Sequence, residues 1–210
     1  LEPAPIEQPE IKNSFEEPAS KIQKGPEDLI WKQLTEGLDR WRSEDNLYQD
    51  QLALRILAAN KIRECYQTKA PTLKLEGHPS NRLTSLPSEI GLLTHLRELD
   101  LTDNTLKDLP PEIIQLTNLQ TLRLNKNQIQ NFPPEIVQLI NLQYLFLEWN
   151  QIEHLPSEIG RLINLRVLFL EGNRIQDIPP QIGQLTNLQA LKLEKNLIRH
   201  LPSEIGKLTN

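Results

Sequence analysis

The sequence lacks several features of membrane proteins and of disulfide-bonded proteins. Cys65 is its one cysteine, so no disulfide can form within the chain. Uninterrupted apolar runs are only a few residues long, too short for a membrane-spanning helix, and no signal-peptide segment opens the chain. Methionine is absent, including at position 1, which indicates a processed or trimmed piece of a longer protein. We therefore expect no membrane insertion, and the single cysteine is compatible with a reducing compartment.

Motifs of nucleic-acid binding and of catalysis are also missing. The formal net charge is −5, and no basic cluster could follow a phosphate backbone. We find no glycine-rich phosphate loop, no paired cysteine ligands and no nucleophile turn. Cys65 is interpreted as a small buried residue, because the sequence suggests no histidine partner nearby. We expect no nucleic-acid partner, no cofactor, no metal and no enzyme activity within these residues.

Composition divides the sequence into three parts. Residues 1–28 contain five prolines and seven acidic residues but few large apolar groups, which is typical of a segment that cannot order itself. We interpret 1–28 as a flexible acidic leader, either a plain linker or a secretion signal. Residues 29–69 and 70–210 are the second and third parts.

Residues 29–69 are expected to form a helical N-terminal cap. Two apolar faces at helical spacing are made by Ile30, Leu34, Leu38 and Trp41 and by Leu52, Ile56, Ala59 and Ile62. The segment RSEDN (42–46) between them is rich in capping and turn residues. An antiparallel helix hairpin is therefore predicted.

From residue 70 onward the sequence repeats with a period of 23. Five copies fit the pattern L-x-x-L-x-L-x-x-N-x-[LI]-x-x-[LIF]-P-x-[EQ]-I-x-x-L-x-[NH] without a slip, and they open at Leu96, Leu119, Leu142, Leu165 and Leu188. An earlier unit of about 70–95 is imperfect, and we expect a bulge at GHPSN (77–81). This pattern is the leucine-rich repeat signature, whose repeats have 20–29 residues.

Each fixed slot of the repeat has a physical role. The L-x-L pair points inward from a short strand, and the asparagine is expected to satisfy backbone groups where the backbone turns away. The proline ends the strand, and the following EIxxL packs inward as a short helix or 3-10 turn. No coil can bury its apolar side alone, so neighbouring coils must stack. We predict an α/β fold, a right-handed leucine-rich-repeat solenoid of about six units with a parallel concave sheet, preceded by an α-helical hairpin.

The last three residues of the sequence match segments that elsewhere lead directly into a new copy of the repeat. Residues 208–210, LTN, match 116–118 and 185–187, each of which is followed at once by the leucine that opens a copy. We therefore expect the C-terminal end of the stack to be truncated.

Two segments carry a resemblance to known proteins. The LPxEIGxL stretches resemble those of short bacterial and Ras-group leucine-rich repeats. Residues 31–87, with Trp31, Trp41, Ile62, Cys65 and Leu83–Pro87, resemble the helical cap of secreted bacterial leucine-rich-repeat effectors. In some of those effectors the repeats are the substrate-recognition arm of an E3 ubiquitin ligase. The sequence departs from that group, because its repeats have 23 residues and Cys65 does not match the ligase cysteine, which lies in a later domain.

The variable slots of the repeat point outward from the strands and therefore define the concave face. Bulky apolar residues gather there in two adjacent copies, namely Tyr144, Phe146, Trp149, Val167 and Phe169. Four of the ten aromatic residues in the sequence belong to this aromatic cluster. Exposed apolar patches on soluble proteins mark interaction sites, and Tyr and Trp are enriched at binding hot spots. The cluster is either a protein-binding site or a set of rings that cover one another.

Charged residues lie beside the aromatic cluster. Glu148, Glu171 and Glu194 fill one slot of three successive copies, and like charges in line across a sheet are mildly destabilising. Their counter-charge is either internal, from Lys126, Lys192 and Lys195, or a basic side chain of a partner. We assign the predicted protein-binding site to Tyr144, Phe146, Trp149, Val167, Phe169, Arg123, Glu148, Glu171, Lys192 and Glu194.

Three functions fit these predictions. The first is a protein-protein interaction module of a bacterial effector that binds a host protein on the concave face. The second is the substrate-recognition arm of an E3 ubiquitin ligase whose catalytic domain lies outside this sequence. The third is a signalling scaffold like the Ras-group repeats, with a small GTPase as partner. The resemblance implies a cytoplasmic location or secretion into a host cytoplasm.

Overall fold

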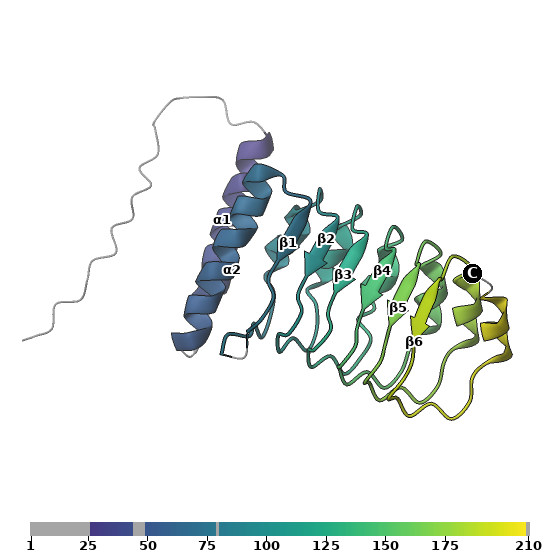
Figure 1. Cartoon of the computed structure of the whole chain (residues 1–210). Helices are drawn as coiled ribbons and strands as arrows, with labels where there is room; N and C mark the ends of the chain where they lie inside the picture. The colour runs from purple at the N-terminus through teal and green to yellow at the C-terminus, as the bar shows by residue number, and fades with distance from the viewer. Residues whose placement is uncertain (1–25, 44–48, 79, 209–210) are drawn as a thin grey trace, which may run out of the picture.

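The computed structural model describes residues 26–43, 49–78 and 80–208. Two helices, α1 (Pro26–Arg42) and α2 (Gln49–Thr68), stand side by side at one end of a curved stack of coils (Figure 1). Six short strands form one parallel sheet in the order β1 to β6. Their bounds are β1 Thr72–Lys74, β2 Glu98–Asp100, β3 Thr121–Arg123, β4 Tyr144–Phe146, β5 Val167–Phe169 and β6 Ala190–Lys192. This is the predicted α/β solenoid with a helical cap.

The repeated leucines build the interior. The middle residue of every strand faces inward, and Leu99, Leu122, Leu145 and Leu168 are fully buried. Each strand pairs with the next in the register set by the period of 23, for example Leu122 opposite Leu145. Because each coil buries its leucines against its neighbours, the core is continuous from α1 to the last coils.

A ladder of asparagines satisfies the backbone where each strand ends, as predicted. Asn150 is a representative member: its Nδ2 donates to the carbonyls of Leu124 and Leu147 at 2.9 and 3.1 Å. Its Oδ1 accepts from the N–H of Ile129 at 3.0 Å. Asn104, Asn127 and Asn173 make the equivalent bonds and are also buried. One asparagine thus links two coils at a turn that no strand ladder reaches.

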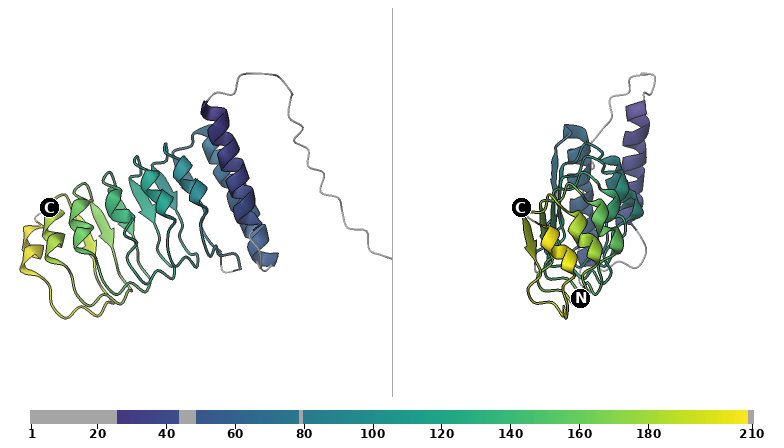
Figure 2. Two further views of the ribbon diagram at one scale, coloured as in Figure 1. Left: turned by 180° about the vertical axis from the view of Figure 1, so that it is seen from behind. Right: turned by 90° about the vertical axis from the view of Figure 1, so that its right-hand side faces the viewer.

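The convex side consists of one short 3-10 helix per coil, seen in a row from behind in Figure 2. Pro87, Pro110, Pro156, Pro179 and Pro202 each precede such a helix, with φ between −66° and −73°. In the coil that contains Pro133 the helix is shorter and covers Ile136–Gln138. The prolines therefore direct the backbone into the convex return, as their fixed φ predicts.

The cap differs from the sequence prediction in two respects. α1 begins at Pro26, so residues 26–28, assigned to the leader, are helical; proline suits a first helical position, and Glu27 and Asp28 suit a first turn. The leader's residues 1–25 lie outside the described part of the protein. Leu34, Leu38 and Trp41 are buried as predicted, whereas Ile30 is exposed.

The buried face of α2 was also partly mispredicted. Leu52 and Ile56 are 41% and 37% exposed, while Arg55 is only 5% exposed. The Arg55 guanidinium donates to the carbonyl of Trp41 and to Ser85 Oγ, and it lies 5.0 Å from the Trp41 ring. Periodicity alone predicted that Leu52 would be buried, but Arg55, held by these partners, lies on the buried face of α2 instead. Ala59 and Ile62 are buried as predicted.

The imperfect first unit contains the predicted bulge. His78 and Asn81 exchange two backbone hydrogen bonds, of 2.9 and 2.7 Å, which close a small loop before the backbone rejoins the repeat. Neither helix among the described residues is long and apolar enough to cross a bilayer.

Candidate functional site

Strands β4 and β5 carry the aromatic cluster on the outward side of the sheet. The register places Tyr144 beside Val167 and Phe146 beside Phe169. These four residues are half-buried, in contrast to the fully buried leucines between them. The alternation of the strand therefore brings four residues of the predicted site together on one surface.

The two phenylalanines are in direct contact. Their ring centroids are 5.4 Å apart with an interplanar angle of 82°, an edge-to-face arrangement. The Arg123 guanidinium lies 4.4 Å from the Phe146 centroid, and Lys192 Nζ lies 4.4 Å from the Phe169 centroid. The ring pair is thus flanked by a cation on each side, one from β3 and one from β6.

Trp149 lies just past the end of β4 in an unusual backbone conformation. Its φ is +58°, in the left-handed region that bulky residues seldom adopt. All five residues in this slot have positive φ, namely Asp103, Lys126, Trp149, Gly172 and Lys195. The frame imposes the conformation, so a tryptophan here costs backbone energy that glycine or asparagine would avoid.

The Trp149 ring lies over the neighbouring coil. A Cβ added at Gly172 would come within 2.7 Å of Trp149 Cε3, so the glycine leaves the space that the ring occupies. Lys195 Nζ lies 4.6 Å from the ring centroid. The tryptophan is nevertheless 47% exposed, the largest uncovered ring of the cluster.

The three members of the glutamate column have different surroundings. Lys195 donates to Glu171 Oε1 at 2.8 Å, and this bond holds the pKa of Glu171 below its ordinary value. Glu148 Oε2 is buried and has no hydrogen-bond partner among the described residues. Burial raises the pKa of Glu148, although a bond from its own backbone and the charge of Lys192 oppose the rise. Among the described residues, a direct bond to one of the lysines considered from the sequence is present for Glu171, whereas Lys192 acts on Glu148 only through its charge, and Glu194 is exposed.

Arg123, assigned to the site, is held mainly by its own sheet. Its Nε lies 3.3 Å from Glu98 Oε1 and 3.8 Å from Asp100 Oδ2. Glu98 and Asp100 occupy outward slots of β2, and these ion pairs were not predicted from the sequence. The sequence signal for these ion pairs was an arginine in an outward slot of one copy and two acidic residues in outward slots of the copy before it.

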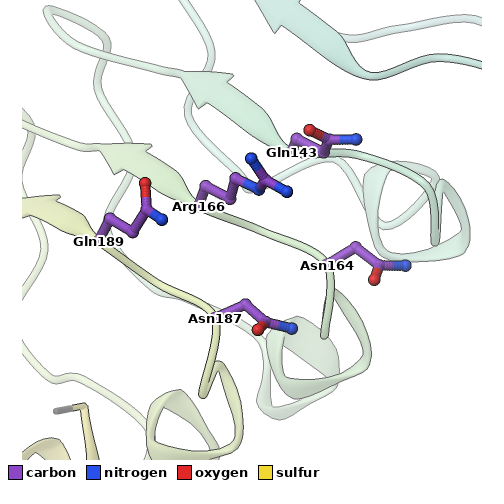
Figure 3. Close-up of a pocket in the computed structure, with 5 residues that line it drawn as sticks. All are labelled: Gln143, Asn164, Arg166, Asn187 and Gln189. Carbon is purple, nitrogen blue, oxygen red and sulfur yellow. The ribbon is translucent and has the colours of Figure 1, made fainter. Parts of the chain in front are cut away.

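A polar hollow lies at the edge of the sheet where β4, β5 and β6 begin, and it was not predicted from the sequence. It has a volume of about 630 Å³ and is lined by Gln143, Asn164, Arg166, Asn187 and Gln189 (Figure 3). A second hollow of about 340 Å³ continues along the same edge, lined by Asn118, Gln120, Asn141, Gln143 and Asn164. Of these two, the first alone contains a charged residue. Its signal was Arg166 in a repeat slot that holds glutamine in both flanking copies.

Cys65 does have a histidine nearby, contrary to the sequence prediction. Its Sγ lies 3.9 Å from His95 Nε2, and that nitrogen is 3.2 Å from the carbonyl of Cys65. Burial raises the pKa of the Cys65 thiol to about 11, so the thiol stays protonated at neutral pH and is a poor nucleophile. Among the described residues no group of three or more His, Cys, Asp or Glu residues could hold a metal.

Comparison with known proteins identifies the repeats and does not identify a catalytic domain. A family model described as a leucine-rich repeat region matches residues 72–159 and 134–210. No curated protein matches the sequence.

Solved structures share the fold over most of the repeats. A leucine-rich repeat protein of Leptospira interrogans is 39% identical over 70% of this chain and 37% of that protein, with a TM-score of 0.65. The leucine-rich repeat ectodomain of the plant receptor kinase GASSHO1/SCHENGEN3 from Arabidopsis thaliana is 29% identical over 70% of this chain and 21% of that protein (TM-score 0.59). An internalin of Listeria monocytogenes, 24% identical over 70% of this chain and 48% of that protein (TM-score 0.59), shares the fold.

In all three comparisons the match covers less than half of the other protein. The family model covers more than half of this one. On that ground the chain belongs to the leucine-rich repeat family.

Proposed function

We propose that this protein is a protein-binding solenoid that holds a partner on the concave face, over β4 and β5. The observation that carries the proposal is Trp149, a large and 47% exposed ring placed where the backbone disfavours it. Residues that reduce backbone stability and remain exposed are typical of functional sites.

The rest of the aromatic cluster fits a binding hot spot. Phe146 and Phe169 are fixed by mutual contact and by flanking cations, so little conformational entropy is lost when a partner covers them. The half-buried Tyr144 and Val167 extend the apolar surface along the same strands. The alternative, in which the rings only cover one another, accounts for the phenylalanines but not for Trp149.

Glu148 adds a polar contact to this surface. Its Oε2 is buried and has no hydrogen-bond partner within the described residues, and a basic group on the partner would supply one. In this arrangement the rings provide most of the affinity, and the carboxylate sets the orientation of the partner.

A structural relative supports a protein ligand. The GASSHO1/SCHENGEN3 ectodomain was solved in complex with CASPARIAN STRIP INTEGRITY FACTOR 2, so a solenoid of this fold binds such a ligand there. For the biological role, we propose a bacterial effector that acts on a host protein in the host cytoplasm. The resemblance of the cap residues Trp31, Trp41, Ile62 and Cys65 to those of secreted bacterial effectors supports this role, and the Leptospira interrogans protein adds a bacterial relative of the repeats.

Affinity capture from a host-cell lysate, quantified by mass spectrometry, tests the proposal. The bait proteins are the wild type, Phe146→Ala/Phe169→Ala, and a control, Gln115→Ala/Gln138→Ala, whose exposed residues lie on convex 3-10 helices. The wild type and the control should enrich the same proteins, and the phenylalanine variant should recover them at least about tenfold less. Equal recovery by all three baits would reject the concave site, and small GTPases among the lost proteins would favour the scaffold function instead.

A further inference from the structure

The polar hollow at the start of β4, β5 and β6 contains one unpaired cation. The Arg166 guanidinium has no ion-pair or hydrogen-bond partner within the described residues. The amides of Gln143 and Gln189 on either side of it also have none there, and Figure 3 shows the three residues in a row from adjacent coils. Five guanidinium N–H donors and two amides therefore face solvent around one hollow.

The asparagines of the hollow are already fixed. Asn164 Nδ2 donates to the carbonyl of Ile140 at 2.9 Å, and Asn187 Nδ2 donates to that of Ile163 at 2.7 Å. These bonds leave their Oδ1 atoms as acceptors on rigid amides. The hollow thus combines a free cation with fixed acceptors, which suits a ligand that carries both a carboxylate and an N–H.

Two exposed isoleucines lie in the same two coils as the aromatic cluster. Ile140 and Ile163 are 57% and 55% exposed, and in the flanking copies the same slot holds Thr117 and Thr186. They belong to the coils that lead into β4 and β5, the strands that carry the rings. The apolar substitutions at the edge and on the sheet therefore coincide in the same two coils.

Opposite charges lie at the two ends of the strands that carry the rings. Arg166 immediately precedes β5, whereas Glu148 and Glu171 follow the ends of β4 and β5. The arginine slot and the glutamate slot lie five residues apart, a distance of about 16 Å along a strand. A free cation and an unsatisfied carboxylate oxygen thus lie on opposite sides of the rings.

We propose that the hollow receives an acidic residue of the bound protein, whose carboxylate pairs with Arg166 while a basic residue about 16 Å away reaches Glu148. The inference rests on the proposed protein-binding function and gives the orientation of the partner. A planar guanidinium matches a carboxylate with two parallel hydrogen bonds. The single positive charge of the hollow fits a monoanionic carboxylate better than a phosphate.

Nuclear magnetic resonance of the whole protein tests the hollow without the natural partner. The probe is N-acetyl-glutamate N-methylamide, compared with its glutamine analogue and with N-acetyl-glycine, which mimics the carboxyl terminus of a polypeptide. The glutamate probe should shift the Arg166 Nε–H signal and the amides of Gln143 and Gln189, while the glutamine analogue should bind about tenfold more weakly. The amides of Asn118 and Gln120, which line the second hollow and not the first, serve as an internal reference and should not respond.

Two variants complete the test. Arg166→Gln should abolish the response, and Arg97→Gln should retain it, because Arg97 occupies the same slot three copies away and does not line the hollow. Equal shifts with the glutamate and glutamine probes, or an unchanged response in Arg166→Gln, would overturn the proposal. A response to N-acetyl-glycine alone would overturn the assignment to an acidic residue. Loss of captured protein in Phe146→Ala/Phe169→Ala is a separate result, so the two proposals can fail independently.

Discussion

Two halves of one sheet carry the same frame with different outward residues. On β2 and β3 the outward groups are polar and pair with one another: Arg123 pairs with Glu98 and Asp100, and Thr102 Oγ1 donates to Asn125 Oδ1 at 3.0 Å. On β4 and β5 the corresponding slots hold rings, an exposed tryptophan and a glutamate without a hydrogen-bond partner for one oxygen. The first half is satisfied within the protein, and the second half is not.

The difference between the halves shows that the frame and the surface are separable. Backbone pairing, buried leucines and the asparagine ladder continue unchanged from β2 to β5, so the fold does not require rings on β4 and β5. Because folding is equally well served by the polar pairs of the first half, the rings require another explanation. Binding a partner supplies one.

The largest predicted effect tests whether the two halves share one frame. Asn127→Ala and Asn150→Ala each remove three buried hydrogen bonds and leave one backbone N–H without a partner, while the two carbonyls keep a bond from a neighbouring asparagine, so each should lower the free energy of unfolding by about 3 kcal/mol. Urea denaturation followed by circular dichroism measures both. Asn141→Ala is the control, since its exposed amide makes one bond to Thr117, and it should cost less than about 1 kcal/mol. A much smaller loss for Asn150→Ala than for Asn127→Ala would contradict a common frame.

The next prediction concerns Trp149 and the glycine beneath it. Gly172→Ala adds a Cβ against the Trp149 ring at a backbone φ of +70°, and it should cost about 2 kcal/mol. In a Trp149→Ala background only the backbone strain remains, so the cost should fall to about 1 kcal/mol. The control is Gly206→Ala, whose Cβ would meet nothing within 4 Å and which should change stability by less than about 0.5 kcal/mol. Additive effects of the two substitutions would show that the ring does not rest on Gly172 in solution.

A smaller effect is predicted where the two halves meet. Arg123→Ala removes the cation paired with Asp100, which is 7% exposed and keeps its bond from the Thr102 N–H, and it uncovers one face of Phe146. The loss should be about 1 kcal/mol and should decrease as salt is added, because the ion pairs are partly exposed. Arg166→Ala should leave stability unchanged, since that arginine has no ion pair within the described residues. A salt-independent loss for Arg123→Ala would indicate that ring contact, rather than charge, holds the residue.

The separation of frame and surface also explains what could be predicted from the sequence. Slots that recur every 23 residues have one buried environment, so the roles of Leu145, Asn150 and Pro156 followed from the pattern. The outward direction of Phe146 and Phe169 followed from strand alternation alone.

Features that depend on contacts between particular residues were not predictable. The burial of Arg55 in place of Leu52 depends on a carbonyl of α1 and on Ser85, which no local pattern reveals. The pairing of Lys195 with Glu171, and not with Glu148, depends on the directions that these side chains take on the sheet. The polar hollow forms between residues of three neighbouring coils, so the residue pattern of any one copy does not reveal it.

The smallest predicted effect separates the two glutamates by pH. The pKa of Glu148 is raised by burial, so its contribution to stability is present below the unfolded pKa and is lost as pH rises through the folded pKa. The pKa of Glu171 is lowered by the bond from Lys195, so its contribution is present above the unfolded pKa and is lost as pH falls through the folded pKa. Carbon-detected titration of the glutamate carboxyls should therefore place Glu148 above an ordinary glutamate and Glu171 below it. Across the acidic range, the stability of Glu148→Gln relative to wild type should rise with pH, and that of Glu171→Gln should fall. The same slope for both variants would mean that Glu148 already has an internal cation, and the two halves of the sheet would then be equally satisfied.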